Sequence, residues 1–268
     1  MLKASGVDCE VVATSGPGDA TRITAAAVSN GTRDVIVAGG DGTINEVLQG
    51  LVGRNGRLSI LPRGTANVLA RELELPLDSI AAARVIARRK TKRIHVGCAI
   101  DEITGTKRYF FLMAGIGLDA SVVHRVRPGL KKHFGKAAFW FSGFSHLANW
   151  QPTPFNIEIE GENLEATFVA IGKAASYGGD LAVTPRARLD QPDFEICVIN
   201  SRSRLRFLHL LSYVMRGGVP PDKREVRFVR TSRARATGDA MVQVDGELIG
   251  KLPMRFEIAP ETIEVVVP

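Results

Sequence analysis

The stretch Val35-Ile-Val-Ala-Gly-Gly-Asp-Gly-Thr-Ile-Asn-Glu46 predicts a short apolar strand that turns through three glycines directly into a helix. Gly39, Gly40 and Gly42 allow a tight turn and close approach. Such a turn brings backbone N–H groups to a helix N-terminus, which attracts phosphate. Asp41 stands among these amides, which fits a phosphate that arrives with a metal ion. The alternative is an ordinary structural turn, because glycine-rich turns are common.

A second glycine turn, Leu61-Pro-Arg-Gly-Thr-Ala-Asn-Val-Leu-Ala-Arg71, also follows a strand and starts a helix. If the two strands are neighbours in a parallel sheet, both turns lie at its carboxyl edge, where open α/β sheets bind ligands. Thr65 and Asn67 are then expected near the first turn. Alone, this segment is more often structural.

Strands and helices alternate over residues 1 to about 95, which predicts a parallel sheet covered on both faces. Within the helices, Thr43 and Glu46 predict a capping box, and Asp78 predicts an N-cap. The expected strands are Cys9–Ala13, Val35–Ala38 and Leu58–Leu61, and the expected helices are Ala20–Ser29, Ile44–Leu51, Ala66–Leu73 and Asp78 to Arg89.

After Thr91 strand-like runs dominate, and several alternate apolar and polar residues as half-buried antiparallel strands do. We expect strands at Ile94–Ile100, Tyr109–Met113, Phe155–Ile159, Ala166–Ile171, Phe194–Ile199, Val226–Val229, Val242–Val244, Arg255–Ile258 and Ile263–Val267, with helices near 132–149 and 204–216. The prediction is therefore an α/β domain over 1–95, without its first strand, followed by a β-sandwich domain over 96–268.

The composition narrows the partners and the compartment. The 268 residues carry a net charge of +7, which suits a nucleotide, an anionic membrane surface or a nucleic acid. Cys9, Cys98 and Cys197 fit neither a disulfide framework nor zinc spacing, so we expect a reducing, cytoplasmic location. No apolar run is long enough for a transmembrane helix, and no signal peptide is recognised.

Two further motifs carry candidate chemistry. Ala114-Gly-Ile-Gly-Leu-Asp119 ends in an acid that either holds a metal-bound water or caps a helix. In Val242-Gln-Val-Asp-Gly-Glu247, Asp245-Gly246 predicts a hairpin turn. Two carboxylates at that turn are also suited to accept a proton from a substrate hydroxyl. The common phosphate-loop, serine-hydrolase and zinc-protease motifs are absent.

Taken in order, the four motifs resemble the diacylglycerol kinase catalytic-domain family, which includes bacterial lipid kinases and the sphingosine and ceramide kinases. The stretch Tyr177-Gly-Gly-Asp-Leu-Ala-Val-Thr-Pro185, continuing to Asp190, is similar to the family as well. The first motif is shared with NAD kinases and phosphofructokinases. The resemblance implies a Rossmann-like domain of that type followed by a β-sandwich.

The resemblance also implies an enzyme that moves the γ-phosphoryl group of ATP, with Mg²⁺, to a lipid hydroxyl, most simply that of diacylglycerol. It implies Glu247 as proton acceptor with Asp245 beside it, and Asp41 and Asp119 as acids that organise magnesium. The nucleotide contacts that it implies are Thr14, Gly39, Gly40, Asp41, Gly42, Thr43, Ile44, Asn45, Gly64, Thr65 and Asn67.

Relatives with a structural magnesium site read Leu-Asp-Asp-Gly where this chain has Leu189-Asp-Gln-Pro192. Gln191 therefore stands at the position of the ligating acid, and the resemblance places the carbonyls of Arg188 and Asp193 beside it. A hard cation prefers charged oxygen, so the missing carboxylate weakens such a site. Asp190 and Asp193 are the acids that remain nearby.

The predicted partners are a lipid substrate and, peripherally, an anionic membrane surface, which the basic and aromatic stretch 125–144 suits. The sequence leaves open whether the chain forms a homodimer. One alternative is an NAD kinase-like enzyme that acts on a soluble hydroxyl. Another is a nucleotide- or lipid-binding protein without turnover. No nucleic acid is expected, because no recognised binding module appears.

Overall fold

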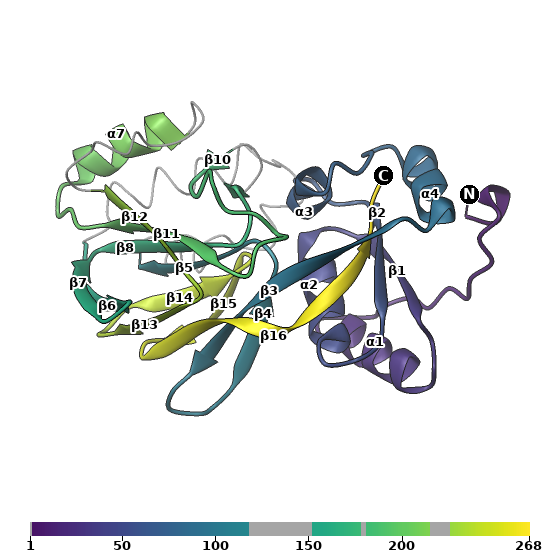
Figure 1. The fold of residues 1–268 in the computed structure, drawn as a ribbon, viewed down its shortest axis with the longest axis horizontal. Coiled ribbons are helices and arrows are strands. Elements are labelled where there is room, and N and C mark those ends of the chain that lie inside the picture. The colour runs from purple at the N-terminus through teal and green to yellow at the C-terminus, as the bar shows by residue number, and fades with distance from the viewer. Residues whose placement is uncertain (1, 118–151, 178–180, 215–225) are drawn as a thin grey trace. The chain divides into compact units, whose positions relative to one another are not determined.

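A computed structural model describes residues 2–117, 152–177, 181–214 and 226–268 of the chain (Figure 1). They form two compact units: Met1–Val96 together with Ala259–Pro268, and Gly97–Ile258. The first unit is α/β and the second is rich in strands, in agreement with the change of pattern after Thr91. The sequence pattern gave no sign that the C-terminal residues belong to the first unit.

The first unit is built on a parallel pair of strands, β1 (Asp34–Gly39) and β2 (Arg57–Pro62), with Gly39 opposite Pro62. The end of β16 (Met254–Val266) pairs in parallel with β2. The unit's helices are the short 3-10 helix η1 (Lys3–Ser5), α1 (Asp19–Ser29), α2 (Asp41–Leu51), α3 (Val68–Glu72) and α4 (Ser79–Arg88). Because α2 follows β1 and α3 follows β2, both helices begin at the carboxyl edge of the sheet.

Close packing holds these helices in place. β2 is buried from Leu58 to Pro62, as expected for a strand covered on both faces. α4 packs against Leu61 and Ile36. The cap predicted for α4 is confirmed, because an Asp78 carboxylate oxygen accepts hydrogen bonds from the N–H groups of Ile80 and Ala81 at 3.1 and 2.9 Å.

The second unit is a sandwich of two sheets around one core. One sheet has the order β12 (Val226–Thr231), β11 (Phe194–Ile199), β8 (Phe168–Gly172), β5 (Met113–Gly117), β14 (Met241–Val244) and β15 (Glu247–Lys251). In the other sheet β6 (Phe155–Ile159) pairs with β13 (Arg233–Thr237) and β7 (Glu162–Ala166), and β3 (Thr91–Asp101) pairs with β4 (Lys107–Phe110) and β16. Side chains of both sheets form the core, among them Ile116 and Ile196 from the first and Ile157 and Phe256 from the second. The β-sandwich prediction is confirmed.

The remaining elements of the second part of the chain are β9 (Ser176–Tyr177), β10 (Leu181–Ala182) and α7 (Arg204–Val214). The helix expected near 132–149 lies outside the described residues. None of the described helices is long and apolar enough to span a membrane.

Three strand predictions need correction. Cys9–Ala13 is not a strand: Val11 is 85% exposed, and the segment is not part of a described sheet. The single strand expected at Tyr109–Met113 is instead the end of β4 and the start of β5, which belong to different sheets. The two strands expected after residue 255 form one strand, β16. Pro260 lies between the stretch that pairs with β13 and the stretch that pairs with β2, so neither of these two pairings needs the N–H that proline lacks.

The reactivity of the three cysteine thiols tests whether the cores are packed as described, because two of the thiols are buried. Burial raises the pKa of the Cys197 thiol to about 12, and Cys98 is buried as well, whereas Cys9 is partly exposed. Because the thiolate is the reactive form, we expect one fast-reacting thiol per native chain and three in denaturant, measured with a disulfide reagent at pH 8. Rapid reaction of two or three thiols in the native protein would contradict the packing of β3 and β11.

Candidate functional site

The two glycine turns of the first unit touch each other. A Cβ atom added to Gly64 would lie 2.6 Å from the Cα of Gly40, and one added to Gly40 would lie 3.0 Å from the Cα of Gly64. The Arg63 N–H also donates to the Gly39 carbonyl at 2.9 Å. Only glycine permits this contact between backbones. The prediction that the two turns lie side by side at the sheet edge is confirmed.

The N-terminus of α2 opens at this contact. Its N-cap residue is Gly40, which has no side chain that could cap the helix. The first helical hydrogen bond runs from the Ile44 N–H to the Gly40 carbonyl at 3.0 Å. The N–H groups of residues 41–43 thus precede the first turn of intrahelical bonds. Three such donors and the positive end of the helix dipole suit a phosphate group.

The predicted capping box of α2 is wrong. The Glu46 carboxylate instead accepts a hydrogen bond from the Ala20 N–H at 3.1 Å, in the first turn of α1. Thr21 donates back to the Glu46 carbonyl at 2.8 Å. Thr43 packs against Gly39, where a Cβ atom would lie 2.7 Å from that of Thr43. Glu46 therefore joins two helices and leaves the start of its own helix without a cap.

Asp41 ties the two turns together. Its carboxylate oxygens accept hydrogen bonds from the N–H groups of Val68 and Leu69, at 3.1 and 3.2 Å, at the start of α3. Asn67 closes the second turn: it accepts from the Gly64 N–H at 2.7 Å and donates to the Gly64 carbonyl at 2.8 Å. Both side chains hold the shape of the turns, a structural task that the sequence did not reveal.

Some of the other residues predicted to contact the nucleotide are exposed to solvent, and others are buried. Thr14 and Thr65 are exposed, as is Gly42, where an added Cβ atom would meet no protein atom within 4 Å. Ile44 and Asn45 are each only 1% exposed, because they face the core from the buried side of α2. Any contact of these two residues with a nucleotide would therefore be made by their main chain, and the predicted contact stays a prediction.

In the second unit, the predicted hairpin turn is confirmed. Asp245 and Gly246 both have positive φ, 47° and 85°, which is typical of a two-residue hairpin turn, and Val244 pairs with Glu247 across it. Buried Gln243 accepts a hydrogen bond from the Gly246 N–H at 2.7 Å. The turn is therefore fixed by its own strand as well as by its backbone conformation.

The Asp245 carboxylate binds three main-chain amides. It accepts hydrogen bonds from the N–H groups of Phe111, Leu112 and Met113 at 2.9, 3.0 and 3.0 Å. These amides lie where the chain leaves β4 and enters β5, so the aspartate satisfies donors that no strand ladder takes up there. This contact explains why the expected strand at 109–113 is split.

Glu247 is the accessible acid of the hairpin. Its side chain is 41% exposed, and one carboxylate oxygen contacts a terminal nitrogen of Arg108 on β4. Within the described part of the chain, the Arg108 Nε is buried without a hydrogen-bond partner. The sequence gave no sign of Arg108, a single arginine in a short strand. The pair holds the Glu247 carboxylate at the edge of the β4 strand.

The third glycine motif has a packing explanation. Gly117 has φ of +87°, and a Cβ atom there would lie 2.6 Å from the Thr167 carbonyl oxygen on the neighbouring chain segment. A glycine is thus required by the fold. Asp119, predicted to organise magnesium, and the basic and aromatic stretch 125–144 lie outside the described residues.

The main-chain carbonyl groups predicted around a structural magnesium site face a lysine side chain in this structure. The carbonyl oxygens of Arg188, Gln191 and Asp193 converge as expected, but on the ammonium group of Lys173. Among the described residues, no three histidine, cysteine, aspartate or glutamate side chains gather in a way that would hold a metal ion. Lys173 was missed although it directly follows the apolar run of β8, an unusual place for a lysine.

Comparison with known proteins agrees with this architecture. Residues 1–99 match the model of the diacylglycerol kinase catalytic domain, and residues 113–267 match that of the YegS C-terminal NAD kinase beta sandwich-like domain. Diacylglycerol kinases of Mycobacterium tuberculosis (strain CDC 1551 / Oshkosh) and Staphylococcus saprophyticus are both 30% identical to the chain over 272 residues. Each alignment covers 100% of this chain and 87% of the relative.

Solved structures show the same fold. A protein from Bacillus anthracis str. Sterne, proposed to be a diacylglycerol kinase, superposes with a TM-score of 0.81 at 24% identity. A further structure from that organism, of a diacylglycerol kinase, gives a TM-score of 0.75 at 22% identity. Both comparisons cover 100% of this chain and 88% of the other.

Proposed function

Because this chain belongs to the diacylglycerol kinase catalytic-domain family, we propose that it transfers the γ-phosphoryl group of ATP to the hydroxyl group of a lipid, diacylglycerol. The observation that carries the proposal is the uncapped N-terminus of α2 at the contact between Gly40 and Gly64. A helix end of this kind binds phosphate through its N–H groups and its dipole. The choice of diacylglycerol as the acceptor is supported by the relatives, which are named diacylglycerol kinases.

In this proposal the glycine turns hold the phosphates of ATP, and exposed Thr65 and Thr14 are further contacts. If Mg²⁺ accompanies the nucleotide, it would neutralise part of the phosphate charge. The Asp41 carboxylate is suited to bind Mg²⁺, because each carboxylate oxygen accepts one amide hydrogen bond and retains a second lone pair. The protein's own contribution to such a transfer is mainly positioning and charge neutralisation.

We assign Glu247 the role of proton acceptor for the lipid hydroxyl, since it is the exposed acid of the hairpin. Arg108 is then a positioning residue, which orients that carboxylate. Asp245 supports the hairpin and keeps no catalytic role in the proposal, because three main-chain amides engage it. The net charge of +7 favours an anionic membrane surface as the place where the lipid is met.

The decisive experiment offers radiolabelled ATP with Mg²⁺ and four acceptors in parallel: diacylglycerol, sphingosine and phosphatidylglycerol in vesicles, and NAD in solution. We expect label in the lipid product with diacylglycerol. Transfer to NAD alone would favour the NAD kinase-like alternative. Nucleotide binding without transfer to any acceptor would favour a binding protein without turnover.

Gly42→Ala separates the fold from the phosphate contact. The added methyl meets no protein atom, and alanine favours a helix over glycine, so the free energy of unfolding should stay equal or rise by about 0.5 kcal/mol. If phosphate lies on the amides of residues 41–43, the methyl displaces it. ATP affinity should then fall roughly thirtyfold, or about 2 kcal/mol, as measured by calorimetry.

Gly40→Ala is the matched comparison, because its Cβ atom would lie 3.0 Å from the backbone of Gly64. That variant should lose stability as well as ATP affinity. Unchanged affinity in Gly42→Ala would place the phosphates elsewhere and remove the observation on which the proposed function rests.

A further inference from the structure

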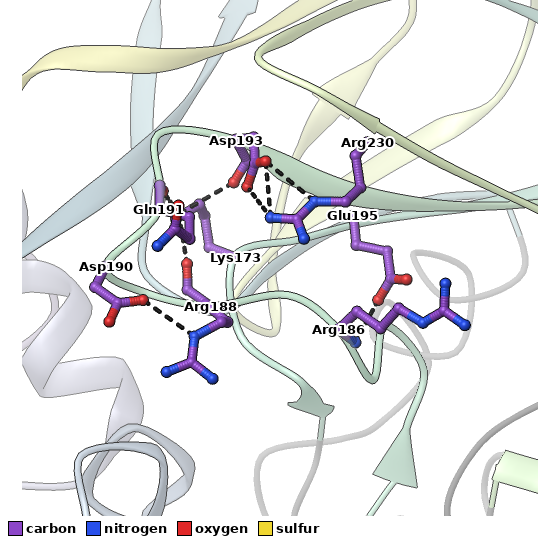
Figure 2. A network of polar contacts seen from close by, with 8 residues as sticks. All are labelled: Lys173, Arg186, Arg188, Asp190, Gln191, Asp193, Glu195 and Arg230. Atoms are coloured by element: carbon purple, nitrogen blue, oxygen red, sulfur yellow. Dashed lines mark hydrogen bonds and ion pairs between the residues drawn. The ribbon is translucent and has the colours of Figure 1, made fainter.

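A lysine ammonium group is buried at the centre of a loop in the β-rich unit (Figure 2). Lys173 directly follows β8, has no exposed surface, and is anchored by its N–H to the Leu112 carbonyl at 2.8 Å. Its Nζ donates hydrogen bonds to the carbonyl oxygens of Arg188, Gln191 and Asp193 at 2.9, 2.5 and 3.1 Å. All three acceptors lie in the loop that leads from β10 into β11.

Donors and acceptors match in number. An ammonium group has three N–H donors and no acceptor, and three carbonyl oxygens meet it here. Convergent carbonyl oxygens are also what a hard metal cation binds. The positive charge in this loop is therefore supplied by a side chain. Burial of an unpartnered charge would be costly, so the three bonds are what makes this position possible.

The neighbouring charged groups are engaged with each other. The Asp193 carboxylate binds Arg230 through contacts of 2.8 to 3.1 Å, and Asp190 pairs with Arg188 at 3.3 Å. Buried Glu195 accepts a hydrogen bond from the Arg186 N–H at 2.6 Å. Burial lowers the pKa of Lys173 to about 8, and nearby Asp193 and Asp190 act in the opposite direction.

We propose that Lys173 is a tethered cation that takes the place of a metal ion, so that the β-rich unit folds and keeps its 184–193 loop in place without a divalent cation. Gln191 is consistent with this exchange. An ammonium group carries one positive charge where a divalent metal carries two, and its three donors are already met by carbonyl oxygens, so no carboxylate is required at that position. The proposal concerns the β-rich unit alone and does not depend on kinase activity.

The first test uses the wild-type chain without nucleotide. Elemental analysis after dialysis against EDTA should find no stoichiometric divalent metal. The melting temperature should be the same in EDTA as in millimolar Mg²⁺, Ca²⁺ or Mn²⁺. A retained metal ion, or a melting temperature that falls in EDTA and recovers with one of these ions, would overturn the proposal.

The second test is Lys173→Met, which keeps the apolar stem and removes the ammonium group. The three carbonyl oxygens lose their donor, although the cost of burying a charge disappears as well, so we expect the melting temperature to fall by roughly 5 °C. Release of the loop should also speed trypsin cleavage after exposed Arg186 and Arg188, by about tenfold, as fragment masses will show.

Lys251→Met is the matched control, since Lys251 makes one exposed ion pair, to Asp239 at 3.1 Å. Its melting temperature and its cleavage rate at the loop should stay at wild-type values. A Lys173→Met protein that melts like the wild type and resists trypsin at the loop would contradict the role of the ammonium group. If this variant does not fold, the metal measurements on the wild type still decide the question.

Discussion

Glu247→Gln should lower lipid phosphorylation by about 10³-fold while the melting temperature and the ATP affinity stay near wild-type values. A positioned general base typically contributes 10² to 10⁴-fold, and glutamine cannot accept the hydroxyl proton. The side chain keeps its size, is 41% exposed, and can still hydrogen-bond Arg108, so little stability is at risk. Turnover on diacylglycerol vesicles, calorimetry with ATP and thermal melting measure the three quantities.

Glu162→Gln is the matched control for this variant. Glu162 is also an exposed glutamate paired with an arginine, through two contacts of 2.6 Å to Arg227, but it lies at the edge strand β7. We expect its turnover to equal that of the wild type. Wild-type turnover in Glu247→Gln would instead refute Glu247 as the proton acceptor.

The features that sequence predicted well have local causes. The two strand–glycine turn–helix segments were recognisable because apolar runs, glycines and helix starts follow one another within a dozen residues. β13 was missed, since its alternation of arginine with alanine carries little hydrophobic signal, although Ala234 and Ala236 are buried. Cys9–Ala13 was over-predicted, because an apolar pattern does not supply the partner strand that its amides need.

The roles of the acids could not be predicted, because each depends on a distant main-chain segment. In the sequence Asp41 looks like a metal-binding carboxylate and Asp245 like a catalytic one, yet Asp41 caps a helix 27 residues away and Asp245 binds amides more than 130 residues earlier. Lys173 likewise meets carbonyl groups 15 to 20 residues further along the chain. Sequence indicates the chemistry of such a residue, and only the fold indicates which group it faces.

Asp245→Asn should reduce the free energy of unfolding of the β-rich unit by about 3 kcal/mol. The carboxylate accepts three amide hydrogen bonds of the charge-assisted kind, each worth about 1.5 kcal/mol or more. An asparagine offers one acceptor oxygen and turns an NH₂ group toward the remaining donors. Asparagine tolerates positive φ as well as aspartate does, so the loss does not come from backbone strain at φ of 47°. Urea unfolding measures it.

Asp239→Asn is the control, since the Asp239 side chain is 81% exposed and makes one surface ion pair, so its unfolding midpoint should be unchanged. The exposure of the buried Cys197 thiol gives a second, local measure of opening within the β-rich unit. The Asp245→Asn variant then separates the two roles, turn residue and proton acceptor, that the sequence leaves open for Asp245. If Asp245→Asn keeps wild-type stability and loses only turnover, the aspartate acts in catalysis. If it loses stability as expected, it acts by fixing the hairpin that presents Glu247.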